Sequence, residues 1–455
     1  MKHRGPAVLS ALGLIVLVFS ASPRAIDPGV TLIGTGLVPG SALDKSGLAG
    51  QKICQFDNTG NCIDQATLGG FGSALAYSGF DNVFLAVPDR GPFDGRTDVP
   101  YLDRVHYMRI AVDTNAAFPN IRMTLLDTVF LKAHGNQDLV GNSAEFEARF
   151  DPEGAAVSGR GTFFISDEYG PAILEFNHQG HLLRPITVPE KFLIANPSGD
   201  VDADGNSLEL YPALNTSGRQ ANRGMEGLAI SPDGRYLFGL MQNALLQDNG
   251  LNASVPPGRV GLNTRLLKVD LQTGATAEYV YVVDAINQGK GVNDLLAIND
   301  HEFLVVERDN RSLVPTPPNT EQTPNVKRIY KLNLAGATDV SLVASLPVSG
   351  AALAALGITP VAKTLFIDLL DSSYKVNATQ TIKDVMAEKI EGLAWGPDLP
   401  DGRHVLYVTS DNDLYPLRPT QIYAFAIGAA ANLDLVPQQF SGPMFAPGRV
   451  KKTLK

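Results

Sequence analysis

The stretch EGLAISPDGRYLFGLMQ, residues 226–242, decides the fold of this chain. Two short apolar segments flank Pro232-Asp233-Gly234. These three residue types favour a tight turn between antiparallel strands. The stretch therefore predicts a β-hairpin.

The same pattern returns five times along the chain. A short apolar stretch, typically with Gly next to a small or acidic residue, is followed after a turn by a second apolar strand. In most copies the second strand ends in acidic residues. The copies cover residues 72–90, 153–168, 226–242, 293–309 and 391–413. A repeat of this length indicates stacked or radial β-units, and each unit has room for the four antiparallel strands of a propeller blade.

We therefore expect an all-β fold, a β-propeller of six or seven four-stranded blades with inserted loops and short helices. The segments before Gly69 and after Gln421 can pair with each other to complete a blade and close the ring. No linker divides the chain, so residues 26–455 are expected to form a single domain.

Three long insertions interrupt the repeat, and the third contains the segment Thr364–Leu370, which we expect to be helical. Long loops inside a compact domain commonly serve as lids or binding loops. The insertions cover residues 195–222, 243–260 and 349–389.

The composition narrows the class of partner. Only 18% of the residues are charged, with 44 Gly and 30 Pro among 455 residues, which suits a turn-rich β protein. The net charge of −10 argues against nucleic acid. It suits cation binding, although a charge of this size is also ordinary for solubility. We expect a monomer that binds a small anionic ester.

The first 25 residues have the features of a secretory signal. Lys2 and Arg4 give a basic start, the apolar run 7–19 is shorter than a membrane span, and small residues precede position 25. An uncleaved anchor is the alternative. We expect an exported protein, periplasmic or extracellular, with no membrane span after signal removal.

Cys54 and Cys62 are the two cysteines of the chain, and a polar, turn-like stretch separates them. In an exported protein this spacing predicts a local disulfide that closes a hairpin.

Acidic residues recur at one place in each unit, which predicts a ring-shaped site. Since the innermost strands of a propeller line its channel, these side chains would converge. They would repel one another unless cations such as Ca²⁺, which takes several oxygen ligands, joined them. The alternative is that acids at strand ends cap turns and accept hydrogen bonds from backbone N–H groups. The ring comprises Asp89, Glu153, Asp167, Glu168, Glu226, Asp294, Glu307, Asp309, Glu391, Asp411 and Asp413.

Basic residues stand beside these acids, namely Arg90, Arg223, Arg308 and Lys389. An Arg can clamp phosphate or carboxylate oxygens with two parallel hydrogen bonds, so the ring could hold cations and an anionic substrate together. Simple ion pairing that neutralises the acids is the alternative.

A second calcium signal lies in the first insertion. Asp200, Asp202 and Asp204 alternate ahead of Gly205, like the first half of an EF-hand loop. Tyr211 stands where the closing Glu would be. The prediction is a structural calcium ion, and the alternative is a solvated acidic turn.

Taken together, these blocks resemble the signature segments of the phytase-like family, whose members are called "esterase-like activity of phytase" proteins. The resemblance covers residues 69–425. It is carried by DRGP (89–92), SDEYGP (166–171), NRGMEGLA (222–229), ERD (307–309), KIEGLA (389–394) and SDND (410–413).

The resemblance implies an exported bacterial β-propeller related to the calcium-dependent phytases, which hydrolyse phosphomonoesters with clustered calcium ions. The first hypothesis is therefore a calcium-dependent phosphoric ester hydrolase in which ring acids hold the metals or orient water. Its catalytic residues would be Arg90, Arg223, Arg308, Glu226 and Glu307.

Two alternatives stay open. A propeller lactonase or carboxylic esterase with one channel metal would use acidic or Asn ligands, for which Asn293-Asp294 and Asn412 are candidates. A non-catalytic exported binding propeller would use the same acids and Arg residues as structural pairs. No G-x-S-x-G elbow, P-loop or H-E-x-x-H motif occurs in the chain.

Overall fold

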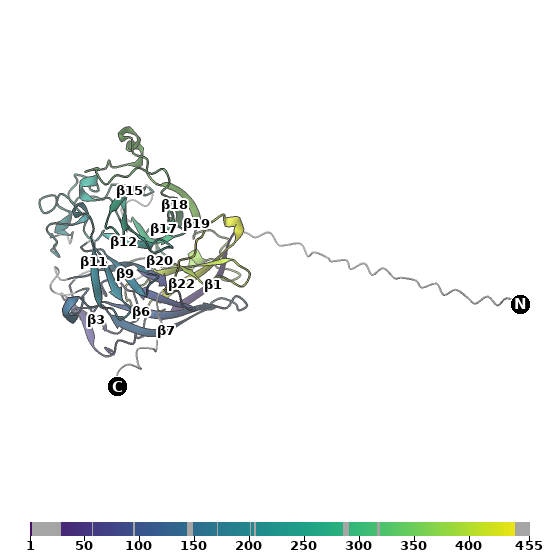
Figure 1. Cartoon of the computed structure of the whole chain (residues 1–455). Coiled ribbons are helices and arrows are strands. Elements are labelled where there is room, and N and C mark those ends of the chain that lie inside the picture. Colours follow the sequence, from purple (N-terminus) through teal and green to yellow (C-terminus); the bar gives the residue numbers. More distant parts are fainter. Residues whose placement is uncertain are drawn as a thin grey trace.

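Each of the five sequence repeats forms the two inner strands of a four-stranded antiparallel sheet in the computed structural model (Figure 1). The structure describes Met1 and residues 29–441, apart from 57, 94–95, 143–148, 171, 201, 204–205, 285–290 and 316–318. The predicted signal segment, from residue 2 to 25, lies outside the described residues.

The five sheets are the blades of a propeller, and in each of the first four the chain runs from the axis to the rim. Blade 1 comprises β4 (Ala74–Tyr77), β5 (Val83–Val87), β6 (Arg104–Val112) and β7 (Ile121–Phe130). Blade 2 comprises β8 (Pro152–Val157), β9 (Thr162–Asp167), β10 (Ala172–Asn177) and β11 (Leu182–Ile186). Blade 3 comprises β12 (Met225–Ile230), β13 (Tyr236–Met241), β14 (Asn263–Asp270) and β15 (Thr276–Val282). Blade 4 comprises β16 (Val292–Ala297), β17 (Glu302–Arg308), β18 (Lys327–Asn333) and β19 (Ala362–Asp368).

Blade 5 joins the two ends of the described chain. Its inner strands are β20 (Lys389–Gly396), β21 (His404–Asp411) and β22 (Thr420–Ile427), and its outermost strand is β1 (Val30–Val38). β1 pairs antiparallel with β22, from Val30 opposite Ile427 to Val38 opposite Thr420. The prediction that the two ends pair to close the ring is confirmed.

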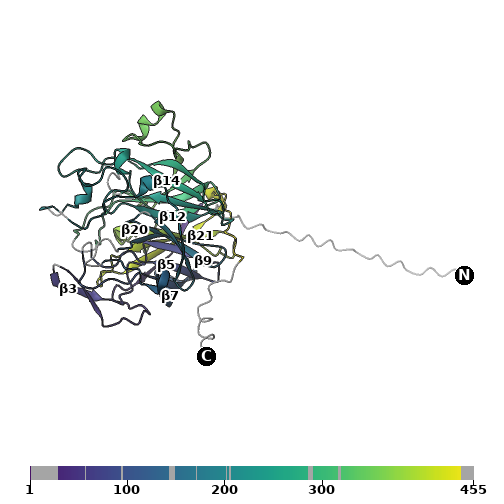
Figure 2. The same ribbon diagram turned by 60° about the vertical axis from the view of Figure 1, so that its left-hand side comes forward.

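The prediction of six or seven blades is wrong, because the ring closes with five. The segment before the first repeat supplies one strand to blade 5 and then a separate hairpin, β2 (Lys52–Gln55) and β3 (Asn58–Asp64). This hairpin lies at the periphery of the ring in both views (Figures 1 and 2). The sequence outside the five repeats therefore completes a blade and adds a rim without adding a blade.

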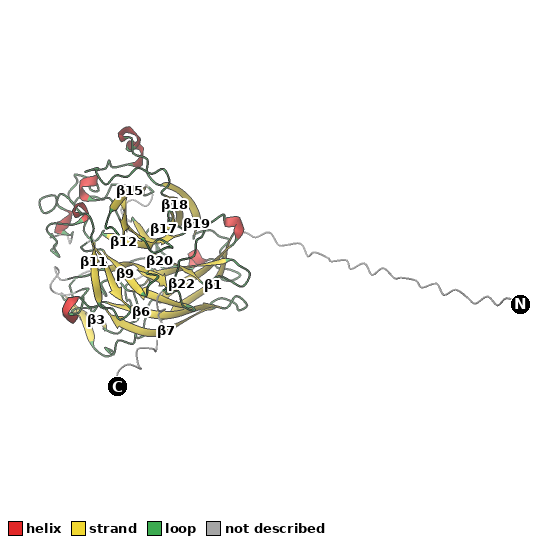
Figure 3. Ribbon diagram, viewed as in Figure 1, coloured by secondary structure: helices red, strands yellow, loops and turns green. Residues whose placement is uncertain are grey.

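The segment Thr364–Leu370, expected to be helical, lies mostly in strand β19. Ile367 pairs with Ile329 of β18 and is buried, whereas Leu365 is exposed. Pairing with β18 provides hydrogen-bond partners for the backbone of this segment, so a helix is not needed. The helices that the structure describes are short 3₁₀ turns in the loops, such as η5 (Leu246–Asp248) (Figure 3).

Apolar side chains fill each interface between neighbouring blades. In β9, Phe163 packs with the residues of blade 1, while the next residue, Phe164, packs with those of blade 3. In the same way, Phe238 of blade 3 and Phe303 of blade 4 meet with ring centroids 4.5 Å apart. Strands buried on both faces read as continuous apolar runs, which is why the repeat is visible in the sequence.

The inner strands approach one another so closely that two of the repeated Gly residues are required. A Cβ at Gly154 would lie 2.6 Å from the carbonyl oxygen of Glu226, and one at Gly227 would lie 2.8 Å from that of Asn293. The Glu-Gly pair of the repeat therefore places a small residue at the contact and an acid beside it.

The hairpin β2–β3 is closed by a disulfide between Cys54 and Cys62, as the spacing predicts. Among the described residues, no helix is long and apolar enough to cross a membrane.

Candidate functional site

The inner strands of four blades are irregular at the position of the recurring acid or amide. The strand register shifts around Glu153, Glu226, Asn293 and Glu391 in β8, β12, β16 and β20. A β-bulge interrupts ladder pairing and re-aims the side chain at that position. Three of these residues, all Glu, line one cavity.

This cavity has a volume of about 1110 Å³ and contains most of the predicted ring. Its walls include the loops that follow the second strands of the blades. The hairpin β2–β3, through Asn61 and Ile63, and the insertion 195–222, through Ser198 and Glu209, form its rim. Its charged lining from the predicted set comprises Asp89, Arg90, Glu153, Glu168, Arg223, Glu226, Arg308, Lys389, Glu391, Asp411 and Asp413.

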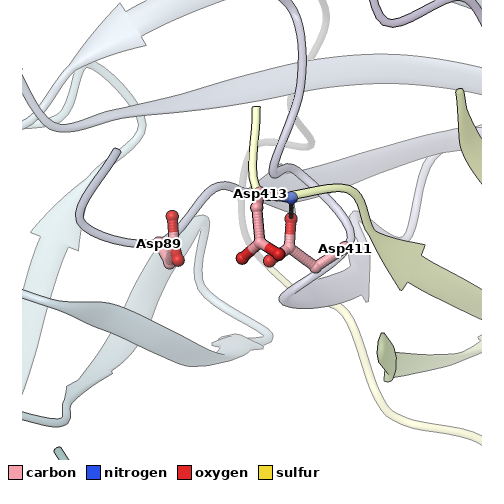
Figure 4. A group of neighbouring side chains, drawn as sticks. All are labelled: Asp89, Asp411 and Asp413. Atoms are coloured by element: carbon pink, nitrogen blue, oxygen red, sulfur yellow. Dashed lines mark hydrogen bonds between the residues drawn. The ribbon is translucent and has the colours of Figure 1, made fainter. Parts of the chain in front are cut away.

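Asp89 belongs to two groups of carboxylates. It lies with Asp411 and Asp413 in one group, and with Asp151 and Glu153 in the other; within each group, one oxygen from each residue lies within 4.8 Å of the others. Figure 4 shows Asp89, on the loop after β5, facing Asp411 at the end of β21 and Asp413 just after it. The backbone N–H of Asp413 donates to Asp411. Two neighbouring cation sites sharing one carboxylate are compatible with this arrangement.

Two cationic side chains partly compensate these acids. Nη1 of Arg90 lies 3.5 Å from Oδ2 of Asp89 and 3.4 Å from Oδ2 of Asp151. Nζ of Lys389 contacts Asp413 and lies 3.7 Å from Oδ2 of Asp411. Among the described residues, the five carboxylates of the two groups therefore form ion pairs with two cationic side chains.

Burial and mutual repulsion act on the pKa values of these carboxyls. Burial raises the pKa of Asp89 to about 6, against the lowering effect of Arg90. Burial, followed by neighbouring carboxylates, raises the pKa of Glu153 well above its ordinary value. For Asp151 and Asp411, burial again raises the pKa well above the ordinary value. Buried acids close to each other cannot all ionise unless a cation joins them.

The cavity lining holds a second acid–base arrangement. Arg308 donates to Glu391, and Gln242 donates to Glu226. Burial, together with the charges of Glu168 and Glu391, raises the pKa of Glu226 well above its ordinary value. Nε of Arg308 is buried and has no hydrogen-bond partner among the residues described.

Four of the predicted ring acids lie outside the cavity lining and bind neighbouring groups. Asp167 accepts from the backbone N–H groups of Asp151, Tyr169 and Gly170. Asp294 accepts from Leu295 and Leu393, thus linking β16 to β20. Asp309 accepts from Asn325 and Val326. Glu307 accepts from the hydroxyl of Tyr281 and from Lys363. These are the backbone-capping and pairing roles that were the alternative for the ring.

In the described part of the calcium loop predicted in the first insertion, the Asp side chains contact other residues of the protein. Asp200 is exposed and lies 3.5 Å from Nη2 of Arg96, and Asp202 accepts from Asn206 and from the hydroxyl of Tyr211. Tyr211 therefore reaches the loop in place of the missing Glu. Asp204 lies outside the described residues.

Sequence reasoning missed Asp151 and Arg259. Asp151 is fully buried and accepts a hydrogen bond from the backbone N–H of Arg90 at 3.0 Å. Its one sequence signal is its position two residues before Glu153. Arg259 lies in an insertion outside every repeat, so nothing local marks it.

With this geometry in place, comparison with known families is informative. The sequence profile of the family described as "Phytase-like: Esterase-like activity of phytase" matches residues 66–414. The chain belongs to the phytase-like family. The match contains every residue of the cavity from Asp89 to Asp413, while the closing strands β1 and β22 lie outside it.

One curated relative of this phytase-like chain is an uncharacterized secreted protein of Arthroderma benhamiae. The two are 27% identical over 304 residues. The match covers 55% of this chain and 54% of the relative, so the chain spans about half of that protein.

Solved structures with some likeness include an ancestral GH74 enzyme and the Cps50 (Swd1) β-propeller domain of Myceliophteria thermophila. Both are 11% identical, with TM-scores of 0.34 and 0.31. The matches cover 83% and 78% of this chain, and 39% and 83% of the respective structures. The fold assignment rests on the strand pairing of the chain itself.

Proposed function

We propose that this phytase-like protein is an exported, calcium-dependent hydrolase of phosphoric esters. The single observation that carries the proposal is Asp89, shared by two groups of three carboxylates in a cavity that also presents Arg and Lys side chains. The family membership supports ester hydrolysis as the reaction class. The secreted relative supports export.

The donor set fits a hard divalent cation. Both groups consist of carboxylate oxygens alone, the ligands that calcium prefers, and their five carboxylates exceed the two nearby cationic groups. Asp89, Asp411 and Asp413 would hold one ion, and Asp89, Asp151 and Glu153 a second. When bound, calcium would supply positive charge that polarises a phosphate oxygen.

The protein's own side chains would then bind and orient the ester. Arg90 is held in place by Asp151, and Arg308 by Glu391, so both guanidinium groups are preorganised to face phosphate oxygens. Glu226, which lines the cavity and has a raised pKa, would accept the proton of the attacking water. Glu307 would act through the framework of blade 4 because it lies outside the cavity lining.

A lactonase or carboxylic esterase with one channel metal is the second candidate, and Asn293 favours it. Asn293 is almost fully buried at a ring position, and neither of its side-chain polar atoms has a hydrogen-bond partner in the described part of the chain. Asn412 gives it no support, because its amide binds the backbone of Gly70 and Arg418.

The test is metal content of the purified protein, paired with turnover of p-nitrophenyl phosphate in EDTA and after calcium is restored. We expect calcium-dependent turnover, lost in EDTA and recovered with calcium, and absent in Asp89→Asn. Folded, calcium-loaded protein that hydrolyses neither phosphomonoesters nor phosphodiesters would overturn the proposal. One tightly bound metal with lactone turnover would favour the second candidate. Absence of a channel metal, with stability unaffected by chelator, would favour a binding protein.

A further inference from the structure

The cavity has an apolar part that the proposed reaction does not use. Two loops contribute most of it, and both also carry acids of one proposed calcium group. The loop after β5 runs from Asp89 to Phe93, and the loop after β21 runs from Asp413, which faces Asp89 in Figure 4, to Leu417. The apolar wall, as we call this part of the cavity lining, comprises Ile63, Phe93, Leu414, Tyr415, Pro416 and Leu417.

A small hydrophobic cluster supports the apolar wall from behind. Ile63 and Leu414 are buried in this cluster together with Ile53 and Tyr101. Phe93 packs against the cluster and stays partly exposed. Because Ile53 and Ile63 belong to the hairpin β2–β3, the cluster joins this disulfide-closed hairpin to both acid-bearing loops.

Buried Asn side chains hold the two loops in place. Nδ2 of Asn142 donates to the carbonyl oxygens of Pro92 and Phe93, and Phe93 has a φ of 74°. A positive φ is rare for a bulky residue and persists only where the surrounding structure maintains it. Nδ2 of Asn412 donates to the carbonyl oxygen of Arg418 at 2.7 Å and closes the second loop. The fold therefore fixes the apolar residues on both loops.

The apolar wall lies next to the acids. Leu417 is four residues after Asp413, and Phe93 is four residues after Asp89, so about 14 Å is the longest Cα–Cα distance within either pair. Leu417 is 79% exposed. A single exposed Leu is ordinary on a protein surface, but this one lines the cavity that contains the acids. One small ester is therefore long enough to contact both the acidic and the apolar parts of the lining.

We infer that the apolar wall binds the alcohol part of the ester while the acidic part of the cavity binds its phosphate. The inference rests on the proposed hydrolase function and names the substrate class, a phosphomonoester whose alcohol part is an alkyl chain or an aromatic ring. Burial of apolar surface against the wall favours such an ester. A highly charged alcohol part loses water at the wall without gaining polar partners, so the wall disfavours polyanionic esters.

The first experiment separates binding from turnover by using phosphonates, in which a carbon–phosphorus bond replaces the ester bond. Calorimetry with the calcium-loaded protein compares ethylphosphonate with hexylphosphonate. We expect the longer chain to bind roughly tenfold or more tightly, since each fully buried methylene strengthens binding by about three- to fourfold. Equal affinity for the two phosphonates, or no binding of hexylphosphonate, would overturn the inference.

The variant Leu417→Ser tests the wall with little risk to the fold, because Leu417 is mostly exposed. We expect the ratio of hexylphosphonate affinity to ethylphosphonate affinity to fall roughly threefold or more, and Leu417→Met, which conserves the apolar volume, to keep it. Leu342→Ser is the matched control, because Leu342 is 98% exposed and lies outside the cavity lining. A ratio that is the same in wild type, Leu417→Ser and Leu342→Ser would contradict the role of the wall.

Turnover of ethyl phosphate and hexyl phosphate, whose leaving alcohols are chemically alike, distinguishes this inference from the proposed function. We expect kcat/KM to be higher for hexyl phosphate. Equal kcat/KM for the two esters would retain the hydrolase and overturn the apolar wall. Chain-length-dependent phosphonate binding, without turnover of either ester or of p-nitrophenyl phosphate, would retain the wall as a binding surface and overturn the hydrolase.

Discussion

Blades 4 and 5 carry the same short motif, an acid, any residue and a second acid at the end of the second strand, and use it differently. In blade 5, Asp411 and Asp413 face Asp89 across the cavity. In blade 4, Glu307 and Asp309 lie outside the cavity lining. Motif and position in the blade are alike, so neither decides the role of the acid.

The difference lies in the partners that each blade supplies. The carboxylate of Glu307 accepts hydrogen bonds from Tyr281 of blade 3 and from Lys363 of β19. The carboxylate of Asp309 accepts hydrogen bonds from two backbone N–H groups in the loop before β18. Asp411 accepts one backbone N–H and otherwise faces acids and Lys389. An acid whose hydrogen bonds are filled stabilises the fold, while an acid left with other acids is available to a cation.

The largest expected effect comes from Asp89→Asn, which removes the carboxylate common to both groups. We expect calcium affinity and esterase turnover to fall by roughly a hundredfold or more, since losing one charged ligand weakens both predicted ions. Calcium titration by calorimetry and p-nitrophenyl phosphate turnover measure this. Retention of full calcium binding would show that the two carboxylate groups that share Asp89 do not hold calcium.

Glu307→Gln is expected to destabilise the fold and to leave calcium binding nearly unchanged. The change removes the charge of one of the two acids that Lys363 contacts, the other being Asp284 at 2.8 Å, and should lower the free energy of unfolding by about 1–2 kcal/mol. Calcium affinity should change less than twofold. Urea denaturation and the same calcium titration test this, with the exposed acid variant Asp300→Asn as the control. A large loss of calcium binding in a stable Glu307→Gln protein would show that Glu307, like Asp89, contributes to calcium binding.

The smallest expected effect is the pH dependence of the metal-free protein. Folding raises the pKa of Asp89 to about 6 and that of Asp167 to about 7, from about 3.9 in an unfolded chain. The folded state then holds more protons, so the stability from these groups is present at low pH and is lost as pH rises through 6 and 7. Burial lowers the pKa of His106 to about 4, which acts in the opposite direction, but it is one group against several acids.

We therefore expect the melting temperature in EDTA to fall by about 2–4 °C between pH 5.5 and 7.5. Calcium should raise the melting temperature more at pH 7.5 than at pH 5.5, because calcium binds the ionised carboxylates. Thermal melting at both pH values, with and without calcium, measures this. A calcium effect that is equal at both pH values would show that these acids are ionised without metal.

Local patterns were sufficient to predict much of the fold. The turn at Pro232–Gly234 and the apolar runs around it follow from residue types over short stretches. The pairing of β1 with β22 follows from the need of a propeller to close its ring. The site was predicted in part: the Glu-Gly pair marks Glu153, Glu226 and Glu391, which line the cavity. Asp151 escaped notice because its role depends on Arg90, 61 residues earlier in the chain.

By itself, the amino-acid sequence determined that the chain is built from repeated β-hairpins, that its ends pair and that Cys54 joins Cys62. These features depend on contacts within one hairpin or on the closure of the ring. The tertiary structure alone decided that five blades close the ring, because closure depends on how apolar side chains fill the interfaces between blades. It also decided which acids face the cavity and that Arg259 stands beside Arg223, because these depend on hydrogen-bond and charge partners that folding brings from distant segments.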